Sequence, residues 1–146
     1  MKIVNRSARY NYEILETFES GIDLLGPEVK SVRAGQVSLN ESFVHLRDGQ
    51  AYLINAHIHP YQNSVETISP TRSRKLLLHK KELMSLRMKL AENNYTLVGM
   101  AIYETKSGLL KVEIGLAMGK KKQDKRRDLK EKDLQRDTDR ELKNYT

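Results

Sequence analysis

The stretch TLVGMAIYETKSGLLKVEIGLAM, residues 96–118, decides the fold class of this chain of 146 residues. Two runs rich in apolar and β-branched residues, 96–104 and 109–118, flank Thr-Lys-Ser-Gly, which is typical of a turn between strands. In the second run Lys111 and Glu113 alternate with apolar residues, so we expect one strand face to lie against a core. The apolar positions are Leu110, Val112, Ile114 and Leu116. This pattern predicts a β-hairpin within a mainly β domain.

Four segments upstream have the β-branched and aromatic composition of short strands. We expect six strands in all, at residues 10–18, 22–25, 42–46, 51–58, 96–104 and 109–118. Ser20-Gly21 marks a turn between the first two strands. Asp48-Gly49 is a strong signal for a tight hairpin turn between the third and the fourth.

Two helices are predicted between these strands. Pro27 suits the first turn of a short helix, and Gly35 suits the left-handed residue that ends it. Residues 79–92 carry leucines and methionines at helical spacing, which predicts a second and longer helix. The remaining polar segments are expected to form an arm at residues 1–9 and a long loop at residues 59–75.

The chain is predicted to form one domain, residues 1–118, followed by a basic tail, residues 119–146. Six strands in so short a segment favour closure of the sheet, because closure removes exposed strand edges. The expected fold class is mainly β with flanking helices, arranged as a small closed β-barrel. An open sheet with one helix across it is the alternative.

The tail is strongly charged and has few apolar side chains. Residues 120–146 contain eleven basic and seven acidic residues, and three leucines are their only aliphatic side chains. A helix of this composition has no apolar face wide enough to pack on a core, so we expect it to be disordered until it meets a large polyanion. The net charge of +7 and the pI near 9.6 favour the same kind of partner, most simply RNA.

Composition also restricts the expected location. The chain has no cysteine, which excludes disulfides and thiolate metal sites. The N-terminus lacks the apolar run of a signal peptide, and no stretch approaches the length of a membrane span. We expect a cytoplasmic protein with no membrane partner, and a monomer.

Signals for enzymatic chemistry are weak. His57 and His59 lie two apart on a predicted strand and could share a metal ion, but no carboxylate or thiol nearby completes a site. Nucleophile, phosphate-loop and paired-carboxylate motifs are absent from the sequence. We predict a protein without catalytic residues, metal or cofactor, and a small metalloenzyme using the two histidines is kept as an alternative.

Basic residues gather in four groups along the chain. The groups are Arg6 and Arg9 on the arm, Lys30 and Arg33 on the first helix, Arg72, Arg74, Lys75, His79, Lys80 and Lys81, and finally Lys120, Lys121, Lys122, Lys125, Arg126 and Arg127. Any one group could be no more than a solvated surface. Four groups together with a net excess of positive charge favour binding to a phosphate backbone.

A helical tail would align its cationic side chains. One nearly continuous stripe at helical spacing would contain Lys125, Leu129, Lys132, Arg136, Arg140 and Lys143. Such a stripe suits a nucleic-acid groove. A surface helix held by ion pairs is the alternative reading of the same residues.

With these segments in place, the chain resembles the SsrA-binding protein (SmpB) family, the bacterial protein partners of transfer-messenger RNA (tmRNA). The matching stretches are NRSAR at 5–9, YEILETFESG at 12–21, GPEVKSVRAG at 26–35, AHIHPY at 56–61, RSRKLLLH at 72–79, KVEIGLAMGKK at 111–121 and DKR at 124–126. They occur in the family's order and cover nearly the whole chain. The match departs from the family at Pro27, at Gln123 and in the wording of residues 62–71.

The resemblance implies a barrel of the oligonucleotide-binding (OB) kind and a role in trans-translation. The protein would bind the tRNA-like part of tmRNA and enter a stalled ribosome with it. Its tail would become helical in the vacant mRNA path, after which the nascent chain is tagged and the ribosome is freed. A ribosomal protein or translation factor of similar fold that binds ribosomal RNA is the alternative function.

The resemblance also assigns residues to these contacts. The implied RNA contacts are Asn5, Tyr12, Glu19 and Leu77, with basic support from Lys30, Arg33, Arg74 and Lys75. The implied tail motif is Gly119, Lys120, Asp124, Lys125 and Arg126. Barrel and tail would therefore have separate tasks, one on the tmRNA and the other on the ribosome.

Overall fold

The computed structural model describes residues 1–62 and 67–119, and all structural statements below concern these residues. They form nine strands and three helices. In chain order these are β1 (Lys2–Val4), α1 (Ala8–Asn11), β2 (Tyr12–Ile22), α2 (Gly26–Arg33), β3 (Val37–Ser38), β4 (Phe43–Arg47), β5 (Gln50–Ile54), β6 (His57–Ile58), β7 (Arg74–Leu77), α3 (Lys80–Glu92), β8 (Thr96–Glu104) and β9 (Leu110–Gly119).

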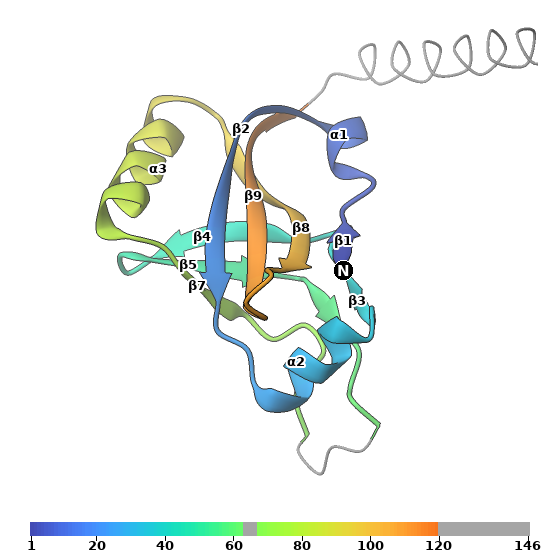
Figure 1. Ribbon diagram of the computed structural model, residues 1–146. Helices are drawn as coiled ribbons and strands as arrows, with labels where there is room; N and C mark the ends of the chain where they lie inside the picture. The colour runs from blue at the N-terminus through green and yellow to red at the C-terminus, as the bar shows by residue number, and fades with distance from the viewer. Residues whose placement is uncertain (63–66, 120–146) are drawn as a thin grey trace, which may run out of the picture.

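Seven of the strands form one antiparallel sheet that returns on itself (Figure 1). The order is β1-β8-β4-β5-β7-β2-β9, and β9 pairs again with β8. The pairings from β8 through β9 therefore close into a ring. The N-terminal strand β1 adds to β8 beside β4, because β4 pairs with Leu97 and Val98 while β1 pairs with residues 101–103. Strands β3 and β6 form a separate two-stranded sheet.

The main core lies inside this ring. In β9 the alternation predicted from the sequence is confirmed. Val112 and Ile114 are fully buried, whereas the neighbouring Lys111 and Glu113 are half-buried. Helix α3 contributes Leu86, which has no exposed surface and packs into the same cluster. Each fully buried aliphatic side chain of this kind stabilises the fold by roughly 1.5–3 kcal/mol.

A second, smaller cluster lies beneath α1. Ala8 of α1 packs there with Val98, Met100 and Ala117 of the long hairpin β8–β9. The Met100 side chain lies directly over Gly115 of β9, because a Cβ on Gly115 would come within 2.9 Å of it. Glycine is therefore needed in β9 to let Met100 pack over it.

The predicted turn at Ser20-Gly21 is wrong. Strand β2 runs unbroken from Tyr12 to Ile22, and residues 23–25 form no second strand. Glycine serves another purpose here, since a Cβ on Gly21 would stand 3.2 Å from the Cβ of Leu77 on the paired strand β7. The residue marks a close approach of two strands and not a reversal of the chain.

The predicted N-terminal arm and long polar loop are also only partly right. Residues 2–4 form β1 and residues 8–11 form α1 instead of a free arm. The last part of the expected loop at 59–75 is strand β7, which pairs with both β5 and β2. Nine strands replace the six expected, because the short elements β1, β3, β6 and β7 carry little periodic signal.

Other elements match the expectations closely. Strand β8 has the predicted bounds, 96–104, and α3 begins one residue later than predicted. The hairpin turn at Asp48 and Gly49 has the positive φ angles, 53° and 73°, that an Asp-Gly turn requires. The expected strand 51–58 is interrupted at Asn55, whose φ of 60° separates β5 from β6. No helix among the described residues has the length and apolarity needed to cross a bilayer.

Candidate nucleic-acid interface

Helix α2 lies at the end of the ring opposite α1 and begins where the sequence predicts (Figure 1). Glu28 in its first turn accepts a hydrogen bond from the Leu25 backbone N–H at 3.0 Å, which caps the helix. Gly35 just beyond its C-terminus has φ of 76°, which is the left-handed conformation that favours glycine. The helix is thereby fixed at both ends.

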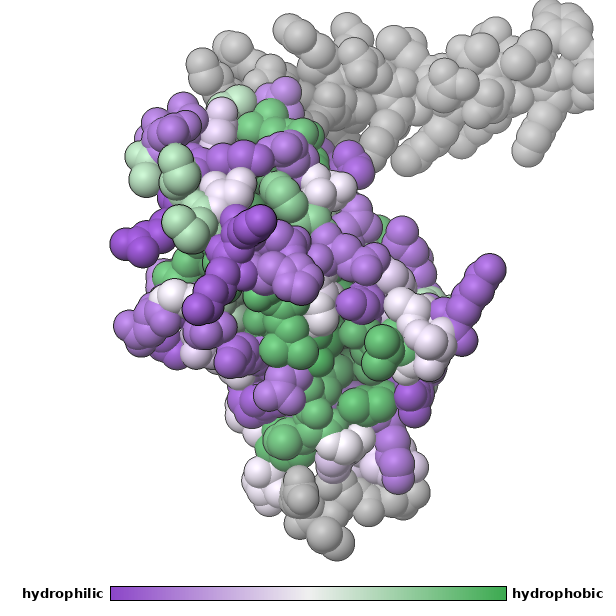
Figure 2. Space-filling view, turned by 60° about the vertical axis from the view of Figure 1, so that its left-hand side comes forward, coloured by the Kyte–Doolittle hydropathy of each residue, from purple (hydrophilic) through white to green (hydrophobic). Residues whose placement is uncertain are grey.

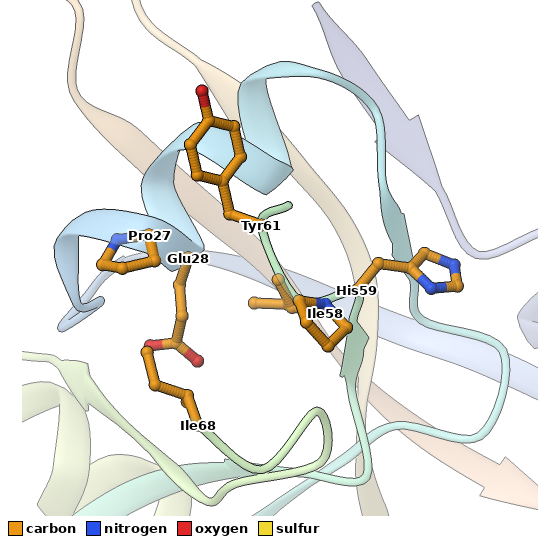
Figure 3. Close-up of a pocket in the computed structure, with 7 residues that line it drawn as sticks. Pro27, Glu28, Ile58, His59, Tyr61 and Ile68 are labelled. Carbon is orange, nitrogen blue, oxygen red and sulfur yellow. The ribbon is translucent and has the colours of Figure 1, made fainter. Parts of the chain in front are cut away.

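Glu28 also connects this helix to the segment that leads into β7. Its carboxylate accepts a hydrogen bond from Arg74 Nε at 2.7 Å and one from Arg72 Nη2 at 2.5 Å. Arg74 further donates to the backbone carbonyls of Ala56 at 2.7 Å and Pro70 at 3.0 Å. Figure 3 shows the carboxylate of Glu28 pointing away from α2, toward the side of the small pocket that Ile68 lines. One buried carboxylate thus holds two arginines and three chain segments together.

The electrostatics of this group follow from its burial. Burial alone would raise the pKa of Glu28, but the hydrogen bonds from Arg72, the Leu25 backbone and Arg74 outweigh it and hold the pKa below its ordinary value. Burial lowers the pKa of Arg74, and the adjacent Glu28 carboxylate opposes that effect. The group is consequently a charged network that is stable only with all its members in place.

Two residues expected at the RNA surface are in fact inside the protein. The Arg74 side chain has 0% exposed surface, and it donates its hydrogen bonds to Glu28 and to the two backbone carbonyls named above. Asn5 is 4% exposed, and its side-chain amide donates to the Leu39 and Gly99 carbonyls at 2.9 and 2.8 Å. Their side chains make hydrogen bonds within the protein in this structure.

Lys30 and Arg33 of α2 are exposed, as expected. The Lys30 ammonium lies 5.2 Å from the centroid of the Tyr61 ring, within reach of a cation–π contact. Arg33 pairs with Glu104 at 3.4 Å and donates to the Gly108 carbonyl at 3.3 Å. These contacts are solvent-exposed and weak, so both cations remain available to a phosphate.

An exposed apolar patch surrounds Leu77. Leu77 and Leu109 are 55% and 59% exposed, and they line a groove of about 380 Å³ with Ile22, Leu24 and Arg33. Lys111 also lies on this groove. Figure 2 shows a continuous apolar area on the lower half of the molecule, bordered by hydrophilic side chains. We call the groove with Leu77, Leu109 and their neighbours in it the Leu77 patch.

The strand register brings Glu19 near this patch. Gly21 pairs with both Leu77 and Lys111, so the side chains of Leu77 and Lys111 share one face of the sheet. Glu19 lies two residues before Gly21 on β2 and is therefore on the same face. It accepts a hydrogen bond from the Tyr103 hydroxyl. Burial and this contact raise the pKa of Tyr103 to about 12. Lys111 was not assigned to the site from the sequence, although its alternation within β9 already placed it on the outer face.

Arg6, Arg9 and Tyr12 lie apart from this surface, at the end of the ring covered by α1. Both arginines are exposed, and Tyr12 lines an open groove of about 640 Å³ that also contains Gly119. Gly119 pairs with Tyr12 as the last residue of β9. Lys75 is exposed on β7, and Arg72 is about one-third exposed beside Glu28. The expected site residues therefore fall into two exposed regions and a buried group.

The sequence also offered a histidine pair and a set of tail residues as candidates. The rings of His57 and His59 are 4.6 Å apart, and within residues 1–62 and 67–119 no group of three potential metal ligands is found. The tail residues Lys120, Lys121, Asp124, Lys125, Arg126, Lys132, Arg136 and Arg140 lie outside the described residues. The assignments made for them stay predictions.

Comparison with known proteins gives a consistent result. A sequence model of the family described as SmpB protein matches residues 2–144. The SsrA-binding protein of Chlorobaculum tepidum is 50% identical over 144 residues, 98% of this chain and 92% of that protein. The SsrA-binding proteins of Trichormus variabilis and Enterococcus hirae are 52% and 46% identical over 143 residues, in each case 97% of this chain and 92% of the relative.

A solved structure supports the same relationship at the level of the fold. The structure is named "tmRNA-SmpB: a journey to the center of the bacterial ribosome". Its matching chain is 50% identical in sequence, with a TM-score of 0.70 and coverage of 83% of this chain and 85% of that chain. Sequence and fold thus agree along nearly the same length.

Proposed function

The chain belongs to the SmpB protein family, and from this premise we propose how its residues serve as the SsrA-binding protein of trans-translation. It is an RNA-binding protein without enzymatic activity, and its partners are tmRNA and the ribosome. The observation that carries this function is identity of about half the residues over nearly the full length, together with the shared fold. We further propose the cytoplasm, where ribosomes translate, as its location.

The ring of strands corresponds, in this proposal, to a small closed barrel of the OB kind. The support is the complete circuit of antiparallel pairings from β8 through β4, β5, β7, β2 and β9 back to β8. An apolar core fills the interior, and helices α2 and α3 contribute Val32 and Leu86 to it. Barrels of this type present curved strand faces and loops to nucleic acid.

The Leu77 patch is proposed as the contact with the tRNA-like part of tmRNA. Folded RNA is recognised through shape and through unstacked bases in loops, which need an apolar surface with nearby polar groups. Leu77 and Leu109 provide the apolar surface, Glu19 can accept a hydrogen bond from a base, and Arg33 and Lys111 can meet phosphates. Lys30 on α2 and Lys75 on β7 are further exposed cations on the elements that carry Arg33 and Leu77.

Asn5 and Arg74 serve this surface as positioning residues in the same proposal. Arg74 fixes the start of β7, from which Lys75 and Leu77 project outward. Its network with Glu28 and Arg72 places α2, and hence Lys30 and Arg33, beside that strand. Asn5 holds the segment between β1 and α1, which carries Arg6.

Residues 119–146 are proposed to act on the ribosome separately from the body. The composition of the tail supports this division, since its net charge of about +4 accompanies almost no apolar side chains. Gly119 is the last residue of β9, so removing everything after it leaves each described strand intact. The body and the tail can therefore be tested independently.

Truncation after Gly119 is the experiment that tests the proposal. The truncated chain is expected to keep its affinity for the tRNA-like domain of tmRNA within about threefold and to lose peptide tagging on stalled ribosomes. A full-length chain with Lys125, Lys132, Arg136 and Arg140 changed to Gln is the matched control, since it keeps the length of the tail but removes four charges. Loss of tmRNA binding on truncation would refute the division of labour.

A further inference from the structure

Helix α3 presents a mixed basic and apolar face to solvent. Leu83, Leu86 and Leu90 pack toward the core inside the ring. Met84 and Met88, one turn apart on another face, are 65% and 61% exposed. Exposed methionines on a helix are flexible apolar surface without a partner in the described part of the chain.

This face borders an open groove. The groove has a volume of about 580 Å³ and lies between α3 and the turn that joins β4 to β5. Its walls carry Arg47 and Asp48 from the turn, Lys80 and Arg87 from α3, and Met84 on the apolar side. In Figure 1 the helix and the turn stand on the same side of the molecule, at the left.

The charges of the groove are not neutralised within the described residues. No carboxylate there lies within 4.0 Å of Arg47, Lys80 or Arg87, whereas Arg33, Arg72 and Arg74 are each paired. The guanidinium of Arg47 instead lies 4.8 Å from the centroid of the Tyr52 ring. Three cations face one acidic side chain, Asp48, in an open groove.

We propose that this groove binds the sugar–phosphate backbone of ribosomal RNA while the Leu77 patch holds tmRNA, an inference that rests on the proposed function. An adaptor with two RNA partners needs two surfaces that can be occupied at once. The groove and the Leu77 patch share no lining residue. The excess of unpaired cations fits phosphates, and Met84 adds apolar contact to a ribose or a base edge.

The test uses the full-length chain with Lys80 and Arg87 both changed to Ala. The matched control is Lys81→Ala with Lys106→Ala, which removes two exposed cations that do not line the groove. Two affinities are measured for each variant from about 50 to 200 mM salt. The first is the affinity of the protein for the tRNA-like domain alone. The second is the affinity of the complex of protein and tmRNA for ribosomes stalled on truncated mRNA.

For the groove variant we expect unchanged affinity for the tRNA-like domain, within about twofold. Its complex should bind stalled ribosomes about tenfold more weakly, and the slope of log affinity against log salt should fall by about two. The control should change neither quantity beyond about twofold. A Lys80→Arg/Arg87→Lys variant should restore both ribosome affinity and slope, because it keeps the two charges in the groove.

Three results would overturn the proposal. Ribosome binding of the groove variant equal to that of the control would show that the groove does not contact ribosomal RNA. Loss of binding to the tRNA-like domain would assign the groove to tmRNA. Failure of the conservative variant to restore ribosome binding would show that the defect is structural. Failure of the proposed function would look different, since the unaltered chain would then not bind tmRNA.

Discussion

Two basic segments lie close together in the sequence and have opposite fates in the structure. Arg72 and Arg74, before and at the start of β7, turn inward onto Glu28. Lys80 and Arg87, on α3 a few residues later, stand on an open groove without a carboxylate within 4.0 Å in the described chain. The difference shows that a run of basic residues does not identify an RNA contact until the cations held by a buried carboxylate are separated from the exposed ones.

The largest expected effect concerns the paired cations. Arg74→Met leaves Glu28 buried without one of its two arginine partners, and removing one member of a buried pair costs about 3–5 kcal/mol of unfolding free energy. Urea denaturation followed by circular dichroism measures this cost. The double variant Glu28→Gln/Arg74→Met should recover a large part of it, since both charges are then absent. If Arg74→Met costs less than about 1 kcal/mol, the network does not hold the fold.

Stability in acid should report on the same group. The folded-state pKa of Glu28 is lowered from 4.5, so its contribution is present above that pH and is lost as the pH falls through the folded value. Each unit of lowering corresponds to about 1.4 kcal/mol. Unfolding free energies measured below pH 4.5 should therefore fall more steeply for the unaltered chain than for Glu28→Gln. Parallel curves for the two proteins would contradict the assignment.

An intermediate effect is expected at the Leu77 patch. Leu77→Ser removes the exposed apolar side chain from the proposed contact with tmRNA, and fully burying a leucine side chain is worth roughly 1.5–3 kcal/mol. We expect binding of the tRNA-like domain to weaken about tenfold, measured by filter binding at fixed salt. Met84→Ser, a comparably exposed apolar residue in the α3 groove, is the control and should leave this affinity unchanged. Equal losses from both would remove the distinction between the two surfaces.

The smallest effect should come from Tyr103. Its folded-state pKa is raised to about 12 from 10.0, so its contribution to stability is full below pH 10 and is lost as the pH rises toward 12. The contact with Glu19 is solvent-exposed, and we expect the change to be only tenths of a kcal/mol. Tyr103→Phe should abolish this part of the alkaline decline in unfolding free energy. A decline of the same depth in Tyr103→Phe would assign it to other groups.

The long periodic elements could be predicted from the sequence, and the short strands β1, β3 and β7 could not. Apolar and β-branched composition gave β8, apolar alternation gave β9, and leucine spacing gave α3, because each covers nine or more residues. Gly21 misled the prediction of β2, since glycine meets the need for a close approach as well as the need for a turn. That approach depends on β7, which lies more than fifty residues away in the chain.

The candidate site was harder to predict than the fold. Charge and the resemblance assigned Arg74 to the RNA surface, although it lies two residues before Leu76, so that both side chains are on the inner face of β7. Asn5 was assigned by resemblance, and its two buried carbonyl partners depend on tertiary contacts that no local pattern shows. Lys111 carried the signal of an outward strand position, but its neighbour Leu77 comes from a strand that was not predicted.

Residues 74 and 75 permit the most direct test of the central claim, that cations held by a buried carboxylate build the fold while exposed cations bind RNA. The measurement is the salt dependence of binding to the tRNA-like domain for Glu28→Gln/Arg74→Met and for Lys75→Met. We expect an unchanged slope for Glu28→Gln/Arg74→Met and a slope lower by about one for Lys75→Met. The unfolding free energy of Lys75→Met should stay within about 0.5 kcal/mol of that of the unaltered chain, because Lys75 is an exposed surface residue. A lower slope for the first variant and an unchanged slope for Lys75→Met would contradict it.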